Sequence, residues 1–322
     1  MRAMSVEETI PLEYADMRLD RYVRVHYKGV TQGWIEKALR KGLIRLDGRK
    51  TRANIRVVQG QKLTLPTLPD LDAPAPKKVI SPDHKLAKAM RAAVITETDQ
   101  WIALNKPVGI ASQGGSKVVW SIDLLAAALV EPNAETTPKL VHRLDKDTSG
   151  VMLLAKTAAA ARRLGDAFKS REMRKCYLAI TVGVPDNSHG KFTQRLLKKP
   201  TPQGGEMMQV DPKGQSAITD YAVVDTLGKK YALVALWPRT GRTHQLRVHL
   251  AHHGTPILGD PKYGDGLPPE DNLRDELHLH AWRLQWPEIK KPIVAKLPDE
   301  FAKSMDILGL NLPSQDPFAG LE

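Results

Sequence analysis

The pattern of apolar and polar positions between residues 18 and 65 predicts a small folded module. Thr31 is placed to begin a helix and Gly42 to end it, because a hydroxyl accepts from free amides and glycine tolerates a left-handed turn. Asp47-Gly48 is typical of a tight turn between two strands. The expected order is two helices followed by two strands, over residues 18–27, 32–41, 43–46 and 62–66.

A larger body begins near residue 93, where short apolar runs outnumber the helical stretches. Strands are expected over residues 93–98, 101–107, 150–156, 176–184, 219–227 and 230–238. Helices are expected over residues 121–130, 157–171 and 241–254. Few helices separate consecutive strands, as a parallel sheet would require. We therefore expect an α+β fold, a mixed and mainly antiparallel sheet with packed helices, preceded by a small α/β domain.

Composition divides the chain into five segments. Residues after the module are rich in proline, which is typical of a linker, and its last part near residues 84–92 has a helical pattern. The expected segments are a flexible arm at 1–17, the module at 18–65, the linker at 66–92, the body at 93–300 and a C-terminal tail at 301–322.

Positive charge is concentrated in the module. Residues 18–65 hold thirteen Lys/Arg and three Asp/Glu, or +10, whereas the whole chain carries +12. Generic solubility charge would not require this asymmetry, so the module is predicted to bind a polyanion. Lys37, Arg40 and Lys41 share one helix face and Arg45 emerges beside it, which makes these four side chains the predicted phosphate contacts.

Several protein classes are disfavoured by the sequence. It contains no run of 18 apolar residues, so we expect no membrane span, and its first residues lack the apolar region of a signal peptide. Its single cysteine, Cys176, forms no disulfide framework or cysteine metal cluster and is expected to be buried and inert. These features predict a cytoplasmic protein.

Candidate chemistry is concentrated in residues 142–150, HRLDKDTSG, just before an apolar strand. A loop that leads into a buried strand can hold a reactive side chain on a rigid scaffold. Asp145 and Asp147 are flanked by His142, Arg143 and Lys146, and nearby cations keep a carboxylate ionised. The residues alone leave two interpretations open, a nucleophilic carboxylate or a salt-bridged turn.

Residues 142–150 resemble the catalytic signature of the pseudouridine synthases of the RluA type. Further segments resemble that family in the same order along the chain, at residues 104–109, 174–185, 238–264 and 277–282. The resemblance covers roughly residues 94–300 and implies a pseudouridine synthase fold. The basic module is similar to the S-four-like RNA-binding domain often fused ahead of this body.

The resemblance also implies roles for individual residues. Asp145 matches the essential nucleophile, and Tyr177 matches the tyrosine that packs on the target base. Arg242 matches the basic residue that pairs with the aspartate, while Leu246 would line the uracil pocket and Arg143 would support the site. This chemistry requires neither a metal nor a redox cofactor. Whether the aspartate attacks ribose carbon 1′ or uracil carbon 6 stays open.

The expected substrate is RNA, most specifically 23S ribosomal RNA, because RluC- and RluD-like members carry the basic N-terminal domain. A monomer is expected, and the modified uridines are not identified by the sequence. Three alternatives remain: a synthase acting on transfer RNA, an inactive RNA-binding or ribosome-assembly factor, and an RNA hydrolase with Asp145 and Asp147 as paired carboxylates.

A group of histidines follows the Gly-Arg-Thr-His-Gln segment. His244 and Arg247 are predicted to contact RNA. His249 and His253 have the i, i+4 spacing of a metal pair, but no acidic residue lies between residues 242 and 253. A phosphate-facing or helix-capping role is therefore favoured over a metal site.

Overall fold

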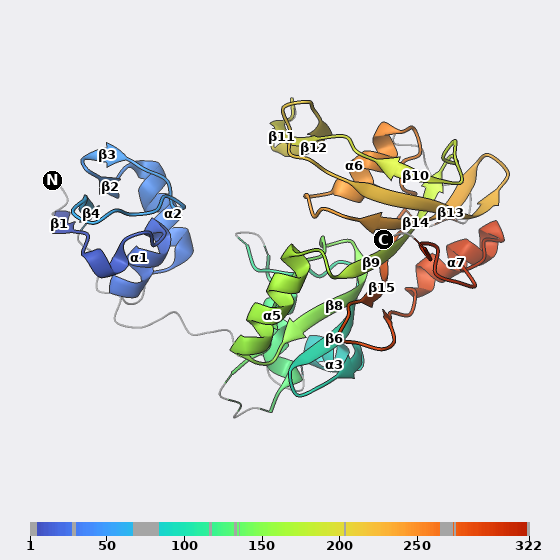
Figure 1. Cartoon of the computed structure of the whole chain (residues 1–322), viewed down its shortest axis with the longest axis horizontal. Coiled ribbons are helices and arrows are strands. Elements are labelled where there is room, and N and C mark those ends of the chain that lie inside the picture. The colour runs from blue at the N-terminus through green and yellow to red at the C-terminus, as the bar shows by residue number, and fades with distance from the viewer. Residues whose placement is uncertain are drawn as a thin grey trace. The chain divides into compact units, whose positions relative to one another are not determined.

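The computed structural model describes residues 5–27, 30–66, 84–115, 118–131, 134, 136–202, 204–264, 273 and 275–320. The chain divides into two compact units, Met1–Val79 and Ile80–Glu322 (Figure 1). Among the described residues, no helix combines the length and apolar character needed to cross a bilayer.

The N-terminal unit is a small sheet with two α-helices packed on it and one short 3-10 helix. Its strands lie in the order β1 (Ser5–Thr9), β4 (Lys62–Pro66), β2 (Arg45–Leu46) and β3 (Arg49–Lys50). Its helices are η1 (Leu12–Tyr14), α1 (Leu19–His26) and α2 (Gln32–Lys41). The predicted ends of α2 are confirmed, because the Thr31 hydroxyl accepts from the Trp34 amide at 3.3 Å and Gly42 is left-handed with φ 70°.

The prediction of a flexible arm at residues 1–17 is wrong for the part that the structure describes. Strand β1 pairs antiparallel with the full length of β4, and Ile10, which follows it, is only 1% exposed. Burying this isoleucine and satisfying the edge of β4 both favour an ordered segment. Residues 1–4 lie outside the described residues.

A ten-stranded sheet forms the larger unit and confirms the predicted mixed, mainly antiparallel α+β fold. Its main path is β10 (His189–Phe192), β13 (Thr219–Leu227), β14 (Tyr231–Pro238), β9 (Arg174–Val182), β15 (Leu279–Gln285), β8 (Ser149–Ala155), β6 (Trp101–Lys106) and β5 (Val94–Glu97). Strands β7 (Lys139–Leu140) and β16 (Ile293–Val294) pair with β8 and β15, while β11 (Leu196–Pro200) and β12 (Glu206–Val210) form a separate hairpin. Only β8 and β15 pair in parallel among these described strands.

Helices cover both faces of this sheet. They are α3 (Lys85–Ala92), α4 (Ile122–Leu125), η2 (Ala126–Leu129), α5 (Ala158–Lys169), α6 (Gln245–His252) and α7 (Asp299–Leu308). Helix α5 lies beside β8 in Figure 1 and packs through Leu164 on a core that includes Leu153. Helices α3 and α4 contribute Met90 and Leu125 to another core, which lines the opposite side of β8 through Met152.

Two predicted segment boundaries need correction. Helix α3 was assigned to the linker, but Met90 is only 1% exposed and packs with the larger unit's strands. The tail expected at 301–322 begins inside α7, whose Phe301 is buried in the core together with Phe318 near the end of the chain. Apolar burial explains both attachments. The part of the predicted linker at residues 67–83 lies outside the described residues.

Candidate active site

The loop that carries Asp145 is anchored by hydrogen bonds from a buried lysine. Lys106, the last residue of β6, has no measurable exposure, and its Nζ donates to three backbone carbonyls. The acceptors are Pro107 at 2.8 Å, Ile110 at 2.7 Å and Lys146 at 3.0 Å. Because the third carbonyl belongs to the residue after Asp145, Lys106 ties the end of β6 directly to the reactive loop.

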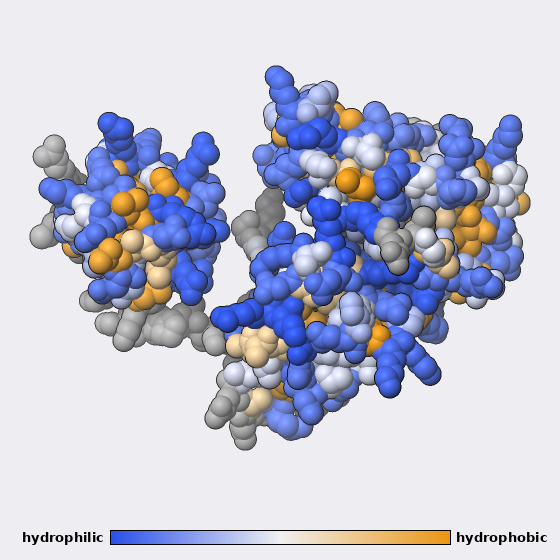
Figure 2. Space-filling model, in the orientation of Figure 1, coloured by the Kyte–Doolittle hydropathy of each residue, from blue (hydrophilic) through white to orange (hydrophobic). Residues whose placement is uncertain are grey.

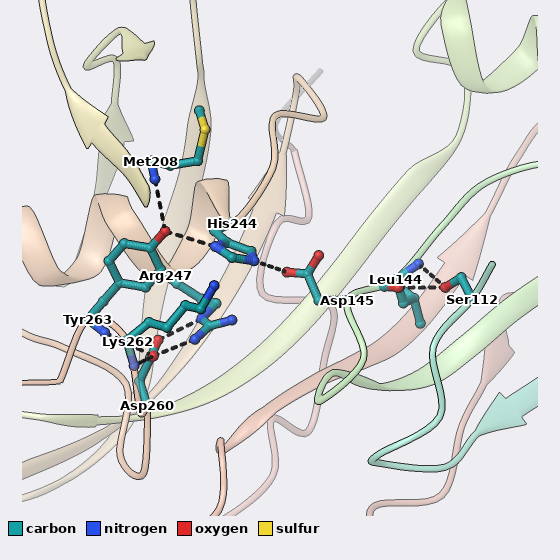
Figure 3. Close-up of polar contacts among 9 residues, drawn as sticks. All are labelled: Ser112, Leu144, Asp145, Met208, His244, Arg247, Asp260, Lys262 and Tyr263. Carbon is teal, nitrogen blue, oxygen red and sulfur yellow. Dashed lines mark hydrogen bonds and ion pairs between the residues drawn. The ribbon is translucent and has the colours of Figure 1, made fainter. Parts of the chain in front are cut away.

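A serine fixes the residue on the other side of Asp145. The Ser112 hydroxyl accepts from the Leu144 amide at 3.0 Å and donates to the Leu144 carbonyl at 2.5 Å (Figure 3). The Gly109 amide also donates to the Lys146 carbonyl at 3.0 Å. The residues before and after Asp145 are therefore both anchored, which limits the positions that its carboxylate can occupy.

Sequence reasoning included Lys106 in a matching segment but gave it no role, and it overlooked Ser112. A lysine inside an apolar strand pattern was the available signal, since a buried ammonium needs hydrogen-bond partners. Burial lowers the pKa of Lys106 to about 7, and the charges of Asp147 and Asp145 oppose this shift.

His142 has a structural contact that its expected role as a cation did not anticipate. Its Nε2 accepts from the Leu153 amide at 2.9 Å, and its ring stacks on Phe168 with centroids 4.3 Å apart. Burial lowers the pKa of His142 to about 3, and Lys175 adds to this shift. The imidazole is therefore neutral at neutral pH and braces the strand that follows the loop.

Asp145 lines a cavity of about 790 Å³ within the larger unit. All the residues for which the sequence predicted active-site roles line it: Arg143, Asp145, Tyr177, Arg242 and Leu246. The loop before β8, strand β9 and the segment leading into α6 thus converge on one space, although their residues are widely separated in sequence. The predicted RNA contacts Lys37, Arg40, Lys41 and Arg45 belong to the N-terminal unit.

The cavity lining is rich in Lys and Arg, of which Arg239 and Arg247 are paired with the buried carboxylates of Asp220 and Asp260. Among its described residues, Asp145 is the single Asp or Glu. The lining includes eight Lys/Arg residues: Arg143, Lys146, Lys169, Arg171, Lys175, Arg239, Arg242 and Arg247. Figure 2 shows a mainly hydrophilic surface on the visible face, with apolar residues in separate patches. A lining rich in cations attracts a polyanion.

Tyr177 and Leu246 belong to the apolar part of the lining. Tyr177 lies in β9 and packs with two of the buried cores, while Leu246 is 7% exposed at the start of α6. Burial raises the pKa of Tyr177, and the Asp145 charge raises it further. The phenol therefore keeps its proton and provides a flat wall beside the carboxylate.

The predicted pairing of Arg242 with Asp145 is absent from the described contacts. Arg242 is exposed at the cavity edge, where its Nε donates to the Ser216 carbonyl at 3.0 Å. The side chain that faces the carboxylate is His244, whose Nε2 lies 3.9 Å from Asp145 Oδ2 (Figure 3). His244 was expected to contact RNA, so the sequence did not foresee its position beside Asp145.

The prediction that Arg247 contacts RNA is also contradicted. Its side chain is 4% exposed and binds Asp260 through two parallel hydrogen bonds, from Nε at 2.7 Å and from Nη2 at 2.5 Å. The Asp260 and Asp145 charges raise the pKa of Arg247 against the effect of burial. A buried, bidentate guanidinium of this kind is held in place, so Arg247 supports the cavity wall from within.

The histidine pair with metal-like spacing is occupied by other contacts. His249 Nδ1 lies 3.0 Å from the Thr219 hydroxyl and its Nε2 lies 3.1 Å from the Gln194 carbonyl. His253 stacks on Phe192 with ring centroids 4.4 Å apart. His249 thus contacts β13 through Nδ1 and the segment before β11 through Nε2, and because it is fully buried it has neither the phosphate-facing nor the helix-capping role that was favoured.

The fold and the loop carboxylate in its cationic cavity together define the catalytic body of a pseudouridine synthase. A family model described as RNA pseudouridylate synthase matches residues 100–252. Ribosomal large subunit pseudouridine synthase C of Rickettsia bellii is 40% identical over 272 residues, 82% of this chain and 87% of the relative. The chain belongs to the RNA pseudouridylate synthase family.

Other relatives agree with this assignment. The protein of the same name from Escherichia coli K12 is 35% identical over 286 residues, which cover 86% of this chain and 87% of the relative. Human RNA Pseudouridylate Synthase Domain Containing 4 has a similar structure, with a TM-score of 0.61 and 32% identity across 71% of this chain and 97% of that one.

The hydrolase alternative needed Asp147 in the same cavity, and Asp147 is absent from the described lining.

Proposed function

We propose that this enzyme isomerises specific uridines of large-subunit ribosomal RNA to pseudouridine, with Asp145 as the nucleophile. The observation that carries the proposal is the placement of one anchored carboxylate, Asp145, in a cavity lined by eight cationic side chains. The similarity to relatives named ribosomal large subunit pseudouridine synthase C supports the choice of RNA.

The reaction breaks the bond between ribose carbon 1′ and uracil nitrogen 1 and joins the same carbon to uracil carbon 5. Carbon 5 loses a proton and nitrogen 1 gains one, so the product is an isomer and no electrons are exchanged. Asp145 adds to the substrate and later leaves, which an ionised carboxylate can do. Attack at ribose carbon 1′ and attack at uracil carbon 6 both use this side chain.

The cavity offers a surface for a uridine taken out of its stack. Tyr177 and Leu246 form an apolar wall against which a flat base can pack. Arg143 and Arg242 are exposed at the same cavity, where their guanidinium groups are available to RNA phosphates. The base and the backbone of the substrate would thus be bound by different parts of the lining.

The N-terminal unit is proposed to hold the RNA outside the cavity. Lys37, Arg40 and Lys41 are exposed on α2, and Arg45 is exposed on β2. Backbone carbonyls at positions 42 and 48 accept from the Arg45 guanidinium, at 3.1 Å each, and orient it. Backbone contacts of this type position RNA without reading its sequence. We also propose that the protein acts as a monomer in the cytoplasm, which light scattering and cell fractionation test.

Substitution of the two loop carboxylates provides the direct test. The substrate is ribosomal RNA transcribed with tritium at uracil carbon 5, because isomerisation releases that tritium to water. Asp145→Asn is expected to release none above background while still binding RNA in a filter assay. Asp147→Asn removes the neighbouring carboxylate, which does not belong to the described cavity lining, and this variant is expected to retain turnover. Full tritium release by Asp145→Asn would refute the proposed role.

A further inference from the structure

Asp145 stands at the end of a chain of polar contacts that begins in the β11–β12 hairpin (Figure 3). The Met208 amide donates to the Tyr263 hydroxyl at 3.3 Å. That hydroxyl lies 2.8 Å from His244 Nδ1, and His244 Nε2 lies 3.9 Å from Asp145 Oδ2. The chain of contacts thus connects a backbone amide to the proposed nucleophile through two side chains.

The contacts of the Tyr263 hydroxyl favour one direction for the proton that it shares with His244. A backbone amide only donates, so the Tyr263 oxygen must accept from Met208. Burial raises the pKa of Tyr263, which therefore keeps its own proton and has His244 Nδ1 as the acceptor. If Nδ1 accepts, the single proton of a neutral imidazole resides on Nε2, the nitrogen that faces Asp145.

Burial and the charged groups around His244 together keep its imidazole neutral. Burial is the main cause that lowers the pKa of His244, and the positive charges of Arg247 and Lys262 lower it further. Asp145 and Asp260 oppose this shift without reversing it. His244 therefore presents a neutral N–H to Asp145 at neutral pH.

The backbone around His244 is held in an unusual conformation. His244 has φ 52°, the left-handed region, where a residue other than glycine is strained unless its surroundings hold it. The Gln245 side chain accepts from the Arg242 amide at 3.1 Å and from the Thr240 hydroxyl at 2.7 Å. These bonds fix the turn, so the strain is maintained at the position that directs His244 toward the cavity.

The tyrosine is positioned independently by a buried ion pair. Asp260 Oδ1 accepts from the amides of Lys262 and Tyr263, at 2.8 and 3.0 Å, while Asp260 also binds Arg247. The Arg247 guanidinium lies 5.1 Å from the centre of the Tyr263 ring. The whole turn that carries Tyr263 is therefore attached to α6, which begins directly after His244.

We propose that Tyr263 and His244 are a positioning pair for the nucleophile: the tyrosine hydroxyl fixes the imidazole with its proton on Nε2, and this N–H orients the Asp145 carboxylate. This inference rests on the proposed function of Asp145. The 3.9 Å separation is longer than a hydrogen bond, and such contacts tighten when substrate fills a catalytic site. A neutral donor orients the carboxylate and leaves its negative charge available for attack.

The tautomer of His244 tests the first half of this proposal without any turnover. Long-range nitrogen–proton NMR of the full chain labelled with 15N-histidine distinguishes the two ring nitrogens, and the His244 signals are those that His244→Gln removes. We expect Nε2 protonated and Nδ1 unprotonated at pH 7. A proton on Nδ1, or on both nitrogens, would overturn the proposal.

Two amide substitutions test the second half. Glutamine places its side-chain amide near the position of the imidazole Nε2, within reach of Asp145, whereas asparagine is too short to reach it. Asparagine tolerates the left-handed backbone better, so a loss in its variant does not come from added backbone strain. We expect His244→Asn to lower kcat by about 10- to 100-fold with little change in KM, and His244→Gln to restore most of it. Equal kcat values for the two variants would contradict the positioning role.

Removal of the tyrosine hydroxyl links the two halves. Tyr263→Phe frees His244 Nδ1 to take up a proton, so kcat should gain a dependence on pH that lies below the ordinary histidine pKa of about 6.5, because burial still lowers the pKa of His244. Tyr221→Phe is the matched control, because Tyr221 is 6% exposed against 8% for Tyr263 and its ring stacks on Phe192, whereas that of Tyr263 contacts His244. An identical pH profile in the two variants would refute the link. If the wild-type protein shows no turnover at all, the proposed function is refuted. That outcome is distinguishable from failure of the positioning proposal, because the NMR result is independent of activity.

Discussion

Gly150 is a position at which a single methyl group should damage the fold directly. It lies in β8, directly after the reactive loop, and pairs in parallel with Ala281 of β15. Its φ is +111°, and a Cβ built there lies 2.2 Å from the Ala281 carbonyl oxygen and 2.7 Å from the Ala281 nitrogen. Because these are backbone atoms, no side-chain rotation relieves the overlap.

The cost of Gly150→Ala follows from that geometry. The strands must separate by about 1 Å to reach ordinary contact, which begins at 3.4 Å. Backbone strain costs about 1–3 kcal/mol and overpacking costs a similar amount, so we expect the free energy of unfolding to fall by about 4 kcal/mol. Ala281 is also paired with Tyr177 of β9, so the displacement reaches the cavity and turnover should fall as well.

Urea unfolding followed by tryptophan fluorescence measures this effect. Five of the six tryptophans belong to the larger unit, so the signal reports mainly on it. Gly165→Ala is the matched control, because Gly165 lies inside α5 with no atom within 4 Å of an added Cβ. Alanine is the better helix former, so this variant should gain up to about 1 kcal/mol. A Gly150→Ala protein as stable as the wild type would refute the reasoning.

Two further predictions concern buried and exposed cations. Lys106→Met leaves three carbonyls without their donor and should destabilise the larger unit by about 3 kcal/mol in urea unfolding at pH 7. The folded pKa of about 7 lies below the ordinary 10.5, so the unfolded chain binds more protons between them and wild-type stability should rise with pH there, a rise that Lys106→Met loses. Replacement of Lys37, Arg40 and Lys41 by alanine should weaken RNA binding and reduce the slope of log affinity against log salt by about 2, measured by filter binding. The matched control replaces three exposed lysines outside the cavity, Lys290, Lys291 and Lys296. An unchanged slope in the first variant, or an unchanged pH dependence in Lys106→Met, would contradict these predictions.

Features set by neighbouring residues were predictable from the sequence. The cap at Thr31 and the left-handed Gly42 define α2 because both act within one helical turn of its ends. The long strands of the larger unit were also found, since each contains an apolar run flanked by turn residues. Strand β1 was missed because its side chains are mostly exposed, and its order depends on pairing with β4 far along the chain.

The sequence identified those site residues that lie in segments resembling the family. Asp145 was identified through the ordered segments of the resemblance, while the flanking charges alone left a salt-bridged turn equally open. Arg247 was assigned incorrectly because spacing on a helix separates two faces only when one face is exposed. Residues 245–250 of α6 are all buried, so the partner Asp260 decided the role of Arg247 and no local pattern revealed it.

The Tyr263–His244 contact is a feature of the site that sequence motifs do not predict. Tyr263 lies within a segment that resembles the family, but its role depends on a hydroxyl meeting Nδ1 of a residue in a left-handed turn. That geometry arises from the Asp260 turn and from α6 together. Sequence spacing carries no information about the direction of a proton between two side chains.

Pseudouridine mapping of 23S ribosomal RNA in living cells tests the central claim most directly. RNA is compared from cells that lack the gene and carry either the wild-type copy or the Asp145→Asn copy, expressed at equal levels. We predict that specific pseudouridines disappear with the gene, return with the wild-type copy and stay absent with Asp145→Asn. Restoration of those pseudouridines by the Asp145→Asn copy would contradict the role of Asp145, and an unchanged 23S map without the gene would contradict the proposed substrate.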